Sequence, residues 1–522
     1  MHQKYSVSNF LSAFYGLMLI FSVSAPALAQ QCEAPYESVT RLYSPNPGSY
    51  TVWNSVYGEP HKGEGFSSIF AIGKDVIAVG EMQTLSGVRP SLMMVRFDQR
   101  GRLVWDSYQG VSGFQNIVKA HATDNGFMVL INIKKAQKRS AMWLGFFDME
   151  GKLKSYKIID DKNFDLHAND IQPSGVNGGW VVAVRASFEI GAGKQQKIRK
   201  NASLYILDKD GSEKSSRSYI LGTDNEISSL GVSKIGGELV GFIATGYFEN
   251  DYGKKVGWVM RLDKDSSLIW QREFSRGDSA NFTVSDMDEN GHIYVAGNII
   301  PSGGDMVGGG VLKLGGESGE IIWQRYYYAR QLHHDFDARG LYVNKDGLVT
   351  LMLLARAHDR DVADEGDSAE DDEVDALESM DYTHVLTLTP RGITIGGDAY
   401  YYGLGAKLKQ LVEGGDGNRI MAGVAKVPPG ELFAEKAARE KGGQPPLIEG
   451  GHIDLPEGTI SEQTKKGLAM LQNKIKAQGH ENSENTVKHE VEKNESAKFD
   501  VDSYDGWVVI GDKPDAYNDP CD

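Results

Sequence analysis

Four histidines and one aspartate are the residues whose types could assemble a metal or substrate site. His61, His167, His333 and His334 each lie in a segment that joins one repeated strand unit to the next, and Asp335 follows the histidine pair. Imidazoles gathered in one place can bind a transition metal or a substrate. Histidine is also common in loops, and these four stand at unequal offsets from the preceding aromatic residue. Unrelated loop positions are therefore the alternative interpretation.

A second group of potential ligands resembles the beginning of a calcium loop. Asp286, Asp288 and Asn290 precede Gly291, which matches positions one, three, five and six of such a loop. The twelfth position is Gly297, where a bidentate glutamate is required, so the ligand set is incomplete. Ordinary turn chemistry explains the same residues. No cofactor is predicted from this sequence, and calcium or a transition metal is kept as an alternative.

Other catalytic signatures are missing from the sequence. There is no Gly-x-Ser-x-Gly elbow, no His-Glu-x-x-His pair and no phosphate-binding glycine loop. The question of an enzyme stays open, and a non-catalytic role is favoured.

The N-terminus reads as a secretory signal over residues 1–29. Lys4 precedes an apolar stretch, and Ala27-Leu28-Ala29 supplies small residues for cleavage. We therefore expect a periplasmic or secreted protein with no membrane span in the mature chain. The two cysteines, Cys32 and Cys521, stand at opposite ends of that chain, and an oxidising compartment favours a disulfide between them over two free thiols.

The net charge of −16 is concentrated in one segment. Twelve acids and one base lie between Asp359 and Asp381, inside an insertion predicted over 357–382. Such a run is typical of a solvated loop, although carboxylates could also bind calcium. No basic stripe exists, so nucleic acid is not expected as a partner.

The elements that must position all these residues form a repeat. An apolar strand, a tight Asp/Gly turn and a strand with an aromatic residue recur, preceded by two further short strands. The last apolar residues of successive copies lie 50 to 60 residues apart: Phe97, Phe147, Leu207, Leu262 and Leu314. Four strands per unit at this period indicate the blades of an all-β propeller.

The ends of the repeat determine the number of blades. The segment around Trp53 looks like an outer strand without a blade before it, and Trp507–Ile510 looks like a third strand without a partner after it. Pairing them yields a seven-bladed β-propeller over residues 30–522, with four-stranded antiparallel blades and a last blade closed by the N-terminal strand. Residues 426–500 are predicted to be a partly helical, partly disordered insertion in blade seven.

Two of the repeats carry a family resemblance. The stretch from Lys313-Leu314 to Gly319-Glu-Ile-Ile-Trp323 and that from Phe97-Asp98 to Trp105 resemble bacterial quinoprotein-type (PQQ-like) propeller repeats. The resemblance implies the fold. No quinone-binding or metal-binding residue of the dehydrogenases can be placed on this sequence, so it implies no activity.

These observations favour a protein–protein interaction scaffold in the cell envelope. We expect the protein to be a monomer and its partner to be another envelope protein. One alternative is a ligand- or metal-binding propeller with a site at the mouth of the central channel. Another is an envelope glycan-binding protein that would use exposed members of the tyrosine runs 326–328 and 400–402, whose alternate members are expected to face outward.

Overall fold

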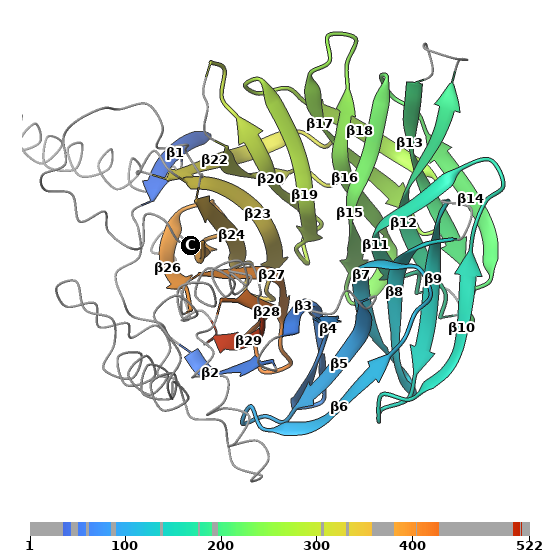
Figure 1. Ribbon diagram of the computed structural model, residues 1–522. Helices are drawn as coiled ribbons and strands as arrows, with labels where there is room; N and C mark the ends of the chain where they lie inside the picture. Colours follow the sequence, from blue (N-terminus) through green and yellow to red (C-terminus); the bar gives the residue numbers. More distant parts are fainter. Residues whose placement is uncertain are drawn as a thin grey trace, which may run out of the picture.

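The computed structural model describes most of the repeated region. The described residues are 35–42, 51–58, 62–84, 90–135, 139–175, 178–190, 197–303, 307–329, 334–357, 381–402, 405–426, 505–511 and 513. They form seven sheets arranged around a central axis, as Figure 1 shows. No helix occurs among them, and the predicted insertions lie almost wholly outside them, so the helical part of the 426–500 prediction stays a prediction.

Each blade is an antiparallel sheet of four strands, and the first strand of each is the innermost. Blades one to three are β3 (Lys62–Ile72), β4 (Asp75–Thr84), β5 (Ser91–Phe97), β6 (Leu103–Gln109); β7 (Phe114–Thr123), β8 (Gly126–Lys134), β9 (Ser140–Phe147), β10 (Leu153–Ile159); and β11 (Asp165–Pro173), β12 (Trp180–Ile190), β13 (Lys197–Leu207), β14 (Glu213–Tyr219). Blades four to six are β15 (Asp224–Ile235), β16 (Glu238–Glu249), β17 (Lys255–Asp263), β18 (Leu268–Phe274); β19 (Ser279–Met287), β20 (Ile293–Ile300), β21 (Gly308–Leu314), β22 (Ile321–Ala329); and β23 (His334–Val343), β24 (Val349–Ala357), β25 (Tyr382–Leu388), β26 (Thr394–Tyr400).

Blade seven confirms the predicted closure of the ring. It consists of β27 (Ala406–Glu413), β28 (Arg419–Ala425), β29 (Asp505–Gly511) and, as its outer strand, β2 (Thr51–Tyr57). The pairing of β2 with β29 is antiparallel, and Trp53 lies opposite Ile510 while Val56 lies opposite Trp507. Strands from the two ends of the chain thus share one sheet (Figure 1). Cys32 and Cys521 lie outside the described residues, and their disulfide stays a prediction.

Four of the outer strands are fastened to the next blade by tryptophans. At these four junctions a tight turn carries a glycine in the left-handed region, and the tryptophan of the preceding blade packs against it. A Cβ atom added at Gly101 would lie 2.8 Å from the Trp53 ring, and one at Gly392 would lie 2.8 Å from Trp323. The indole nitrogens of Trp105, Trp270 and Trp323 donate hydrogen bonds to backbone carbonyls of the same turns. Glycine is therefore needed there both for its φ and for its missing side chain.

The sequence repeat predicts equivalent places on the outer strands for seven aromatic residues: Trp53, Trp105, Tyr156, Tyr219, Trp270, Trp323 and Tyr400. This equivalence is wrong in blades two, three and six. Trp105 lies opposite Arg96, beside the register shift of its strand pair, and the residue at the matching place in blade two is Ser155. Tyr156 is one residue further along, so it faces the other side of the strand and is 55% exposed. In blades three and six the residue beside the register shift is Ser215 or Gly396, and Tyr219 and Tyr400 lie four residues further along. The blade count was correct because it depended on the strands, each of which is present.

The expectation that alternate tyrosines of the two runs face outward is also wrong. Tyr326, Tyr327 and all of 400–402 are buried. One reason lies in a strand that the sequence did not predict. β1 (Glu37–Leu42) pairs in parallel with β22 and adds a fifth strand to blade five (Figure 1). Arg276 donates to the Glu37 carboxylate and also lies over the Tyr326 ring, so this strand is held by charge as well as by backbone pairing.

Trp53→Ala should destabilise the protein by about 3–5 kcal/mol, because it removes a buried ring from the junction between the last and first blades. Tyr156→Ala, on the outer strand of blade two, is the matched control and should change stability by less than about 0.5 kcal/mol. Denaturant unfolding of both variants measures this difference, and equal losses would contradict the role given to Trp53.

Gly392→Ala should cost about 1–2 kcal/mol, since Gly392 has a φ of +76° and no room beside Trp323. The control is Gly396→Ala on the neighbouring strand, where an added Cβ meets nothing within 4 Å. Thermal or denaturant unfolding measures the difference. Equal stability of the two variants would contradict the packing of Trp323 against the turn that contains Gly392.

Candidate functional site: the central channel

Every innermost strand has a β-bulge near its middle. Between each innermost strand and its neighbour the register shifts by one residue, which leaves that residue unpaired. The seven bulge residues are Ser67, Val118, Asn169, Ser228, Thr283, Arg339 and Lys409. We call them the bulge ring. All seven line the central channel and are partly or fully exposed, whereas the residue before each is buried. Bulges turn side chains out of the sheet pattern, so this repeated defect is what lines the channel.

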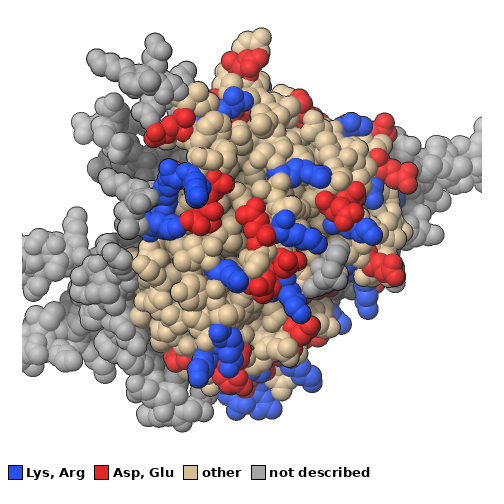
Figure 2. All heavy atoms as spheres, turned by 90° about the vertical axis from the view of Figure 1, so that its right-hand side faces the viewer, with Lys and Arg blue, Asp and Glu red and all other residues tan. Residues whose placement is uncertain are grey.

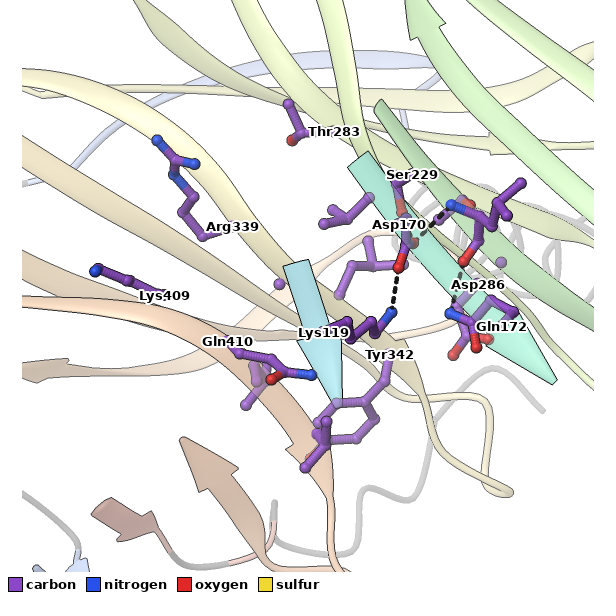
Figure 3. A pocket seen from close by; sticks show the side chains of 18 of the residues that line it. Lys119, Asp170, Gln172, Ser229, Thr283, Asp286, Arg339, Tyr342, Lys409 and Gln410 are labelled. Carbon is purple, nitrogen blue, oxygen red and sulfur yellow. Dashed lines mark hydrogen bonds and ion pairs between the residues drawn. The ribbon is translucent and has the colours of Figure 1, made fainter. Parts of the chain in front are cut away.

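The channel has a volume of about 520 Å³. That size falls in the range of small-molecule pockets. Its wall is mostly polar at the level of the bulge ring, with three hydroxyl side chains, one amide and two cations. No carboxylate belongs to the ring. Figure 3 shows Thr283, Arg339 and Lys409 around this space, with the Lys119–Asp170 pair on another part of the wall.

Polar side chains next to the bulges join neighbouring blades. An innermost strand has one free edge, and its N–H groups need acceptors. The Ser68 hydroxyl accepts from the Ala120 N–H at 2.9 Å, and Asp170 accepts from Leu230 at 2.8 Å. Gln410 of blade seven accepts from Ile69 of blade one at 2.6 Å, across the closure.

The residues just before the bulges are held in a similar way in two blades. Asn132 accepts from the Ala168 N–H at 2.8 Å and donates to its carbonyl at 2.9 Å. Asn298 likewise accepts from the Ala338 N–H at 2.9 Å. Each asparagine comes from the second strand of the preceding blade. Much of the channel's polar lining is thus committed to holding the ring together, and only the remainder is available to a ligand.

Charge is distributed unevenly along the channel. Lys119 is neutralised by Asp170, at 2.8 Å. Arg339 shares the Asp337 carboxylate with Arg356, which leaves two cations on one anion. Further along the strands, toward the turns that lead to the second strands, Asp286 and Glu413 line the same channel. The rise of a strand places Asp286 about 10 Å beyond Thr283 of the bulge ring.

The pKa values of the two acids at this end of the channel are raised above their ordinary values. Burial raises the pKa of Asp286 to about 6, although its carboxylate accepts hydrogen bonds from the N–H groups of Met287 and Val343. Burial also raises the pKa of Glu413, and the nearby Asp346 adds to the effect. The end of the channel that carries these carboxylates therefore disfavours further negative charge.

The predicted histidine set falls on separate blades. His167 lies on β11 of blade three and contacts Asn132 and Asn169. His334 lies on β23 of blade six, fully buried, with its ring 5.1 Å from that of Tyr382. Blades four and five stand between them. The Asp335 carboxylate accepts from the Val307 N–H at 2.7 Å. His61 and His333 lie outside the described residues.

Sequence reasoning missed a buried neighbour of His334. His384 lies on β25, and its ring is 5.7 Å from that of Phe336. Burial, followed by the charge of His334, lowers the pKa of His384 to about 4. Alternation along β25 could have placed His384 on an inward face, but its proximity to His334 depends on the pairing of distant strands.

In the calcium-like turn, Asp286 and Asp288 face different surroundings. Asp286 binds the backbone at the channel wall, as above. Asp288 accepts from the N–H groups of Asn290 and His292 and from the Tyr294 hydroxyl, which is how a turn is closed by its first residue. Among the described residues no group of three or more His, Cys, Asp or Glu side chains is arranged to hold a metal ion.

The outer wall carries charges of both signs. Figure 2 shows Lys and Arg side chains interspersed with Asp and Glu on the side formed by the outer strands of blades two and three. Lys157 and Asp210 form one of these exposed pairs, at 3.6 Å. Within the described part of the chain, no helix is both long and apolar enough to cross a membrane.

Comparison with known proteins leaves the family open. No family model matches the chain, and no curated protein matches it. Among solved structures, a puromycin hydrolase is 12% identical with a TM-score of 0.41 and covers 73% of this chain and 54% of its own. Sqt1 from Chaetomium thermophilum is 10% identical (TM-score 0.39, covering 72% and 97%), and the β-propeller domain of the Trilobed protease from Pyrococcus furiosus is 11% identical (0.35, covering 72% and 91%). These likenesses concern the fold alone.

Asp286→Asn should change how stability depends on pH. A carboxyl whose pKa is raised on folding contributes stability that is present below its unfolded value and is lost as pH rises through about 6. The variant has no carboxyl group here and so does not lose this stability. The difference in free energy of unfolding, variant minus unmodified protein, should therefore increase between pH 4 and pH 7. Urea unfolding at several pH values measures the difference, and a difference independent of pH would contradict the assignment.

Proposed function

We propose that this protein is an exported interaction scaffold that binds another protein of the cell envelope. The observation that carries the proposal is a group of apolar side chains exposed on one face of blades three and four. They are Ile190, Ile198, Ile220 and Tyr252, with exposed fractions of 43%, 68%, 61% and 94%. We call them the apolar rim. Large exposed apolar groups are typical of surfaces that are covered by a partner.

The elements that carry the apolar rim contact one another. Ile190 and Ile198 lie at the end of the β12–β13 hairpin, and Arg199 of this hairpin donates to the Gly222 carbonyl in the connection to blade four. Thr223 in that connection donates to Glu249, at the end of β16. The turn with Tyr252 follows directly. The rim therefore belongs to a continuous set of loops on a rigid base, which suits recognition of a folded partner.

The N-terminal sequence supports the choice of compartment. The signal-like residues 1–29 and the cysteine pair favour the periplasm or the exterior. The resemblance to quinoprotein-type repeats supports the architecture and adds no reaction. Burial of five of the six tyrosines in the two runs leaves little support there for the glycan-binding alternative.

The triple variant Ile198→Ser, Ile220→Ser and Tyr252→Ser tests the apolar rim. Chemical cross-linking in intact cells, followed by affinity purification, should recover one dominant partner with the unmodified protein and at least about fivefold less of it with the variant. Ile269→Ser is the matched control, since Ile269 is 51% exposed on the outer strand of blade four. Equal recovery with the variant and the control would overturn the proposal.

A further inference from the structure

Three neighbouring members of the bulge ring present hydrogen-bond donors to the channel. Arg339, Lys409 and Ser67 come from blades six, seven and one, which are consecutive around the closed ring. All three line the same cavity. Figure 3 shows the Arg339 and Lys409 side chains on neighbouring strands, apart from the Lys119–Asp170 pair. The junction between blades seven and one, where β27 and β28 contact β3, lies within this part of the ring.

Lys409 has no partner among the described residues. No hydrogen bond or ion pair joins its ammonium group to any of them, although it lies within the channel. Burial lowers the pKa of Lys409, and the charges of Arg339 and Lys407 lower it further, against the opposing influence of Glu81. Lys407 is itself paired with Asp381 at 2.9 Å. Lys409 is exposed to the channel and makes no ion pair within the described part of the chain, so its ammonium group can donate to an anion that enters.

The nearest acids do not neutralise this region. Asp337 is shared by two arginines, Arg339 and Arg356. Burial raises the pKa of Glu81, and no ion pair joins its carboxylate to Lys409 within the described part of the chain. Ser67 makes no hydrogen bond to another described residue, so its hydroxyl can still donate. The opposite end of the channel, with Asp286 and Glu413, repels anions and so confines them to the bulge ring.

We propose that Arg339, Lys409 and Ser67 form a binding site for a small oxyanion, the phosphate or carboxylate group of a small molecule that enters the central channel. The guanidinium group would bind two oxygens, as this fork does in other oxyanion sites. The ammonium group would supply a point charge, and the serine hydroxyl one further donor. This site is independent of the apolar rim, which lies on the loops of blades three and four.

Isothermal titration of the full mature protein with inorganic phosphate, and separately with acetate, tests the site at low ionic strength. We expect saturable binding of one anion per chain by at least one of the two probes. Binding of phosphate alone assigns the site to phosphate groups, and binding of acetate alone assigns it to carboxylates. The absence of saturable binding by both would overturn the proposal.

Substitutions then locate the binding. Lys409→Gln should weaken it at least about tenfold, because a charge-assisted hydrogen bond is lost, whereas Lys409→Arg should retain most of it. Arg339→Gln should weaken binding similarly, and Ser67→Ala by a few fold. Lys214→Gln, an exposed lysine on the outer strand of blade three, is the control and should bind as the unmodified protein does. Unchanged binding by Lys409→Gln, with its fold confirmed by circular dichroism, would also overturn the proposal.

Discussion

The structure depends on the packing of an outer-strand tryptophan against a left-handed turn of the next blade. Each such contact joins two sheets that share no backbone hydrogen bonds in their outer halves. At the last junction the tryptophan is Trp53, carried by the N-terminal strand, and the turn contains Gly101 of blade one. One strand therefore completes blade seven and also fastens it to blade one. Without it, the ring would have an open edge and an exposed apolar blade face.

The same closure creates the inner surface. Seven bulges at one level direct seven side chains into a space that is bounded only when all blades are in place. Near them, side chains such as Ser68, Asp170 and Gln410 satisfy the free backbone edges of the adjacent strands. The groups left over, chiefly Lys409 and Ser67, are the ones that can serve a ligand. Stability and binding are thus divided among neighbouring positions of the same strands.

Sequence reasoning could predict the architecture because strand and turn patterns are local. Apolar runs ending in Asp/Gly turns repeat with a recognisable period, and the two unpaired ends could only complete one another. It could not place Tyr156 correctly, since a bulge of one residue changes which face a side chain takes. The bulge ring could not be predicted for the same reason. Neither the residue type of Ser67 nor that of Lys409 indicates that the residue is unpaired in its sheet.

The histidine candidates illustrate the same dependence on the order of the strands. Histidines stand out by type, and their loop positions suggested convergence, yet His167 and His334 lie three blades apart. The pair that the channel does bring together, Arg339 and Lys409, lies 70 residues apart in sequence and consists of common surface residue types. Only the order of strands around the axis shows that they are neighbours.

Amide hydrogen exchange, read by mass spectrometry on peptides covering 51–57 and 505–511, tests the central claim most directly. If the N-terminal strand closes the ring, both peptides should exchange slowly, like that of the central strand β28, and Trp53→Ala should accelerate the two together. Rapid exchange of 51–57 alongside full protection of 505–511 would show that the propeller holds without its N-terminal strand, and would contradict this account.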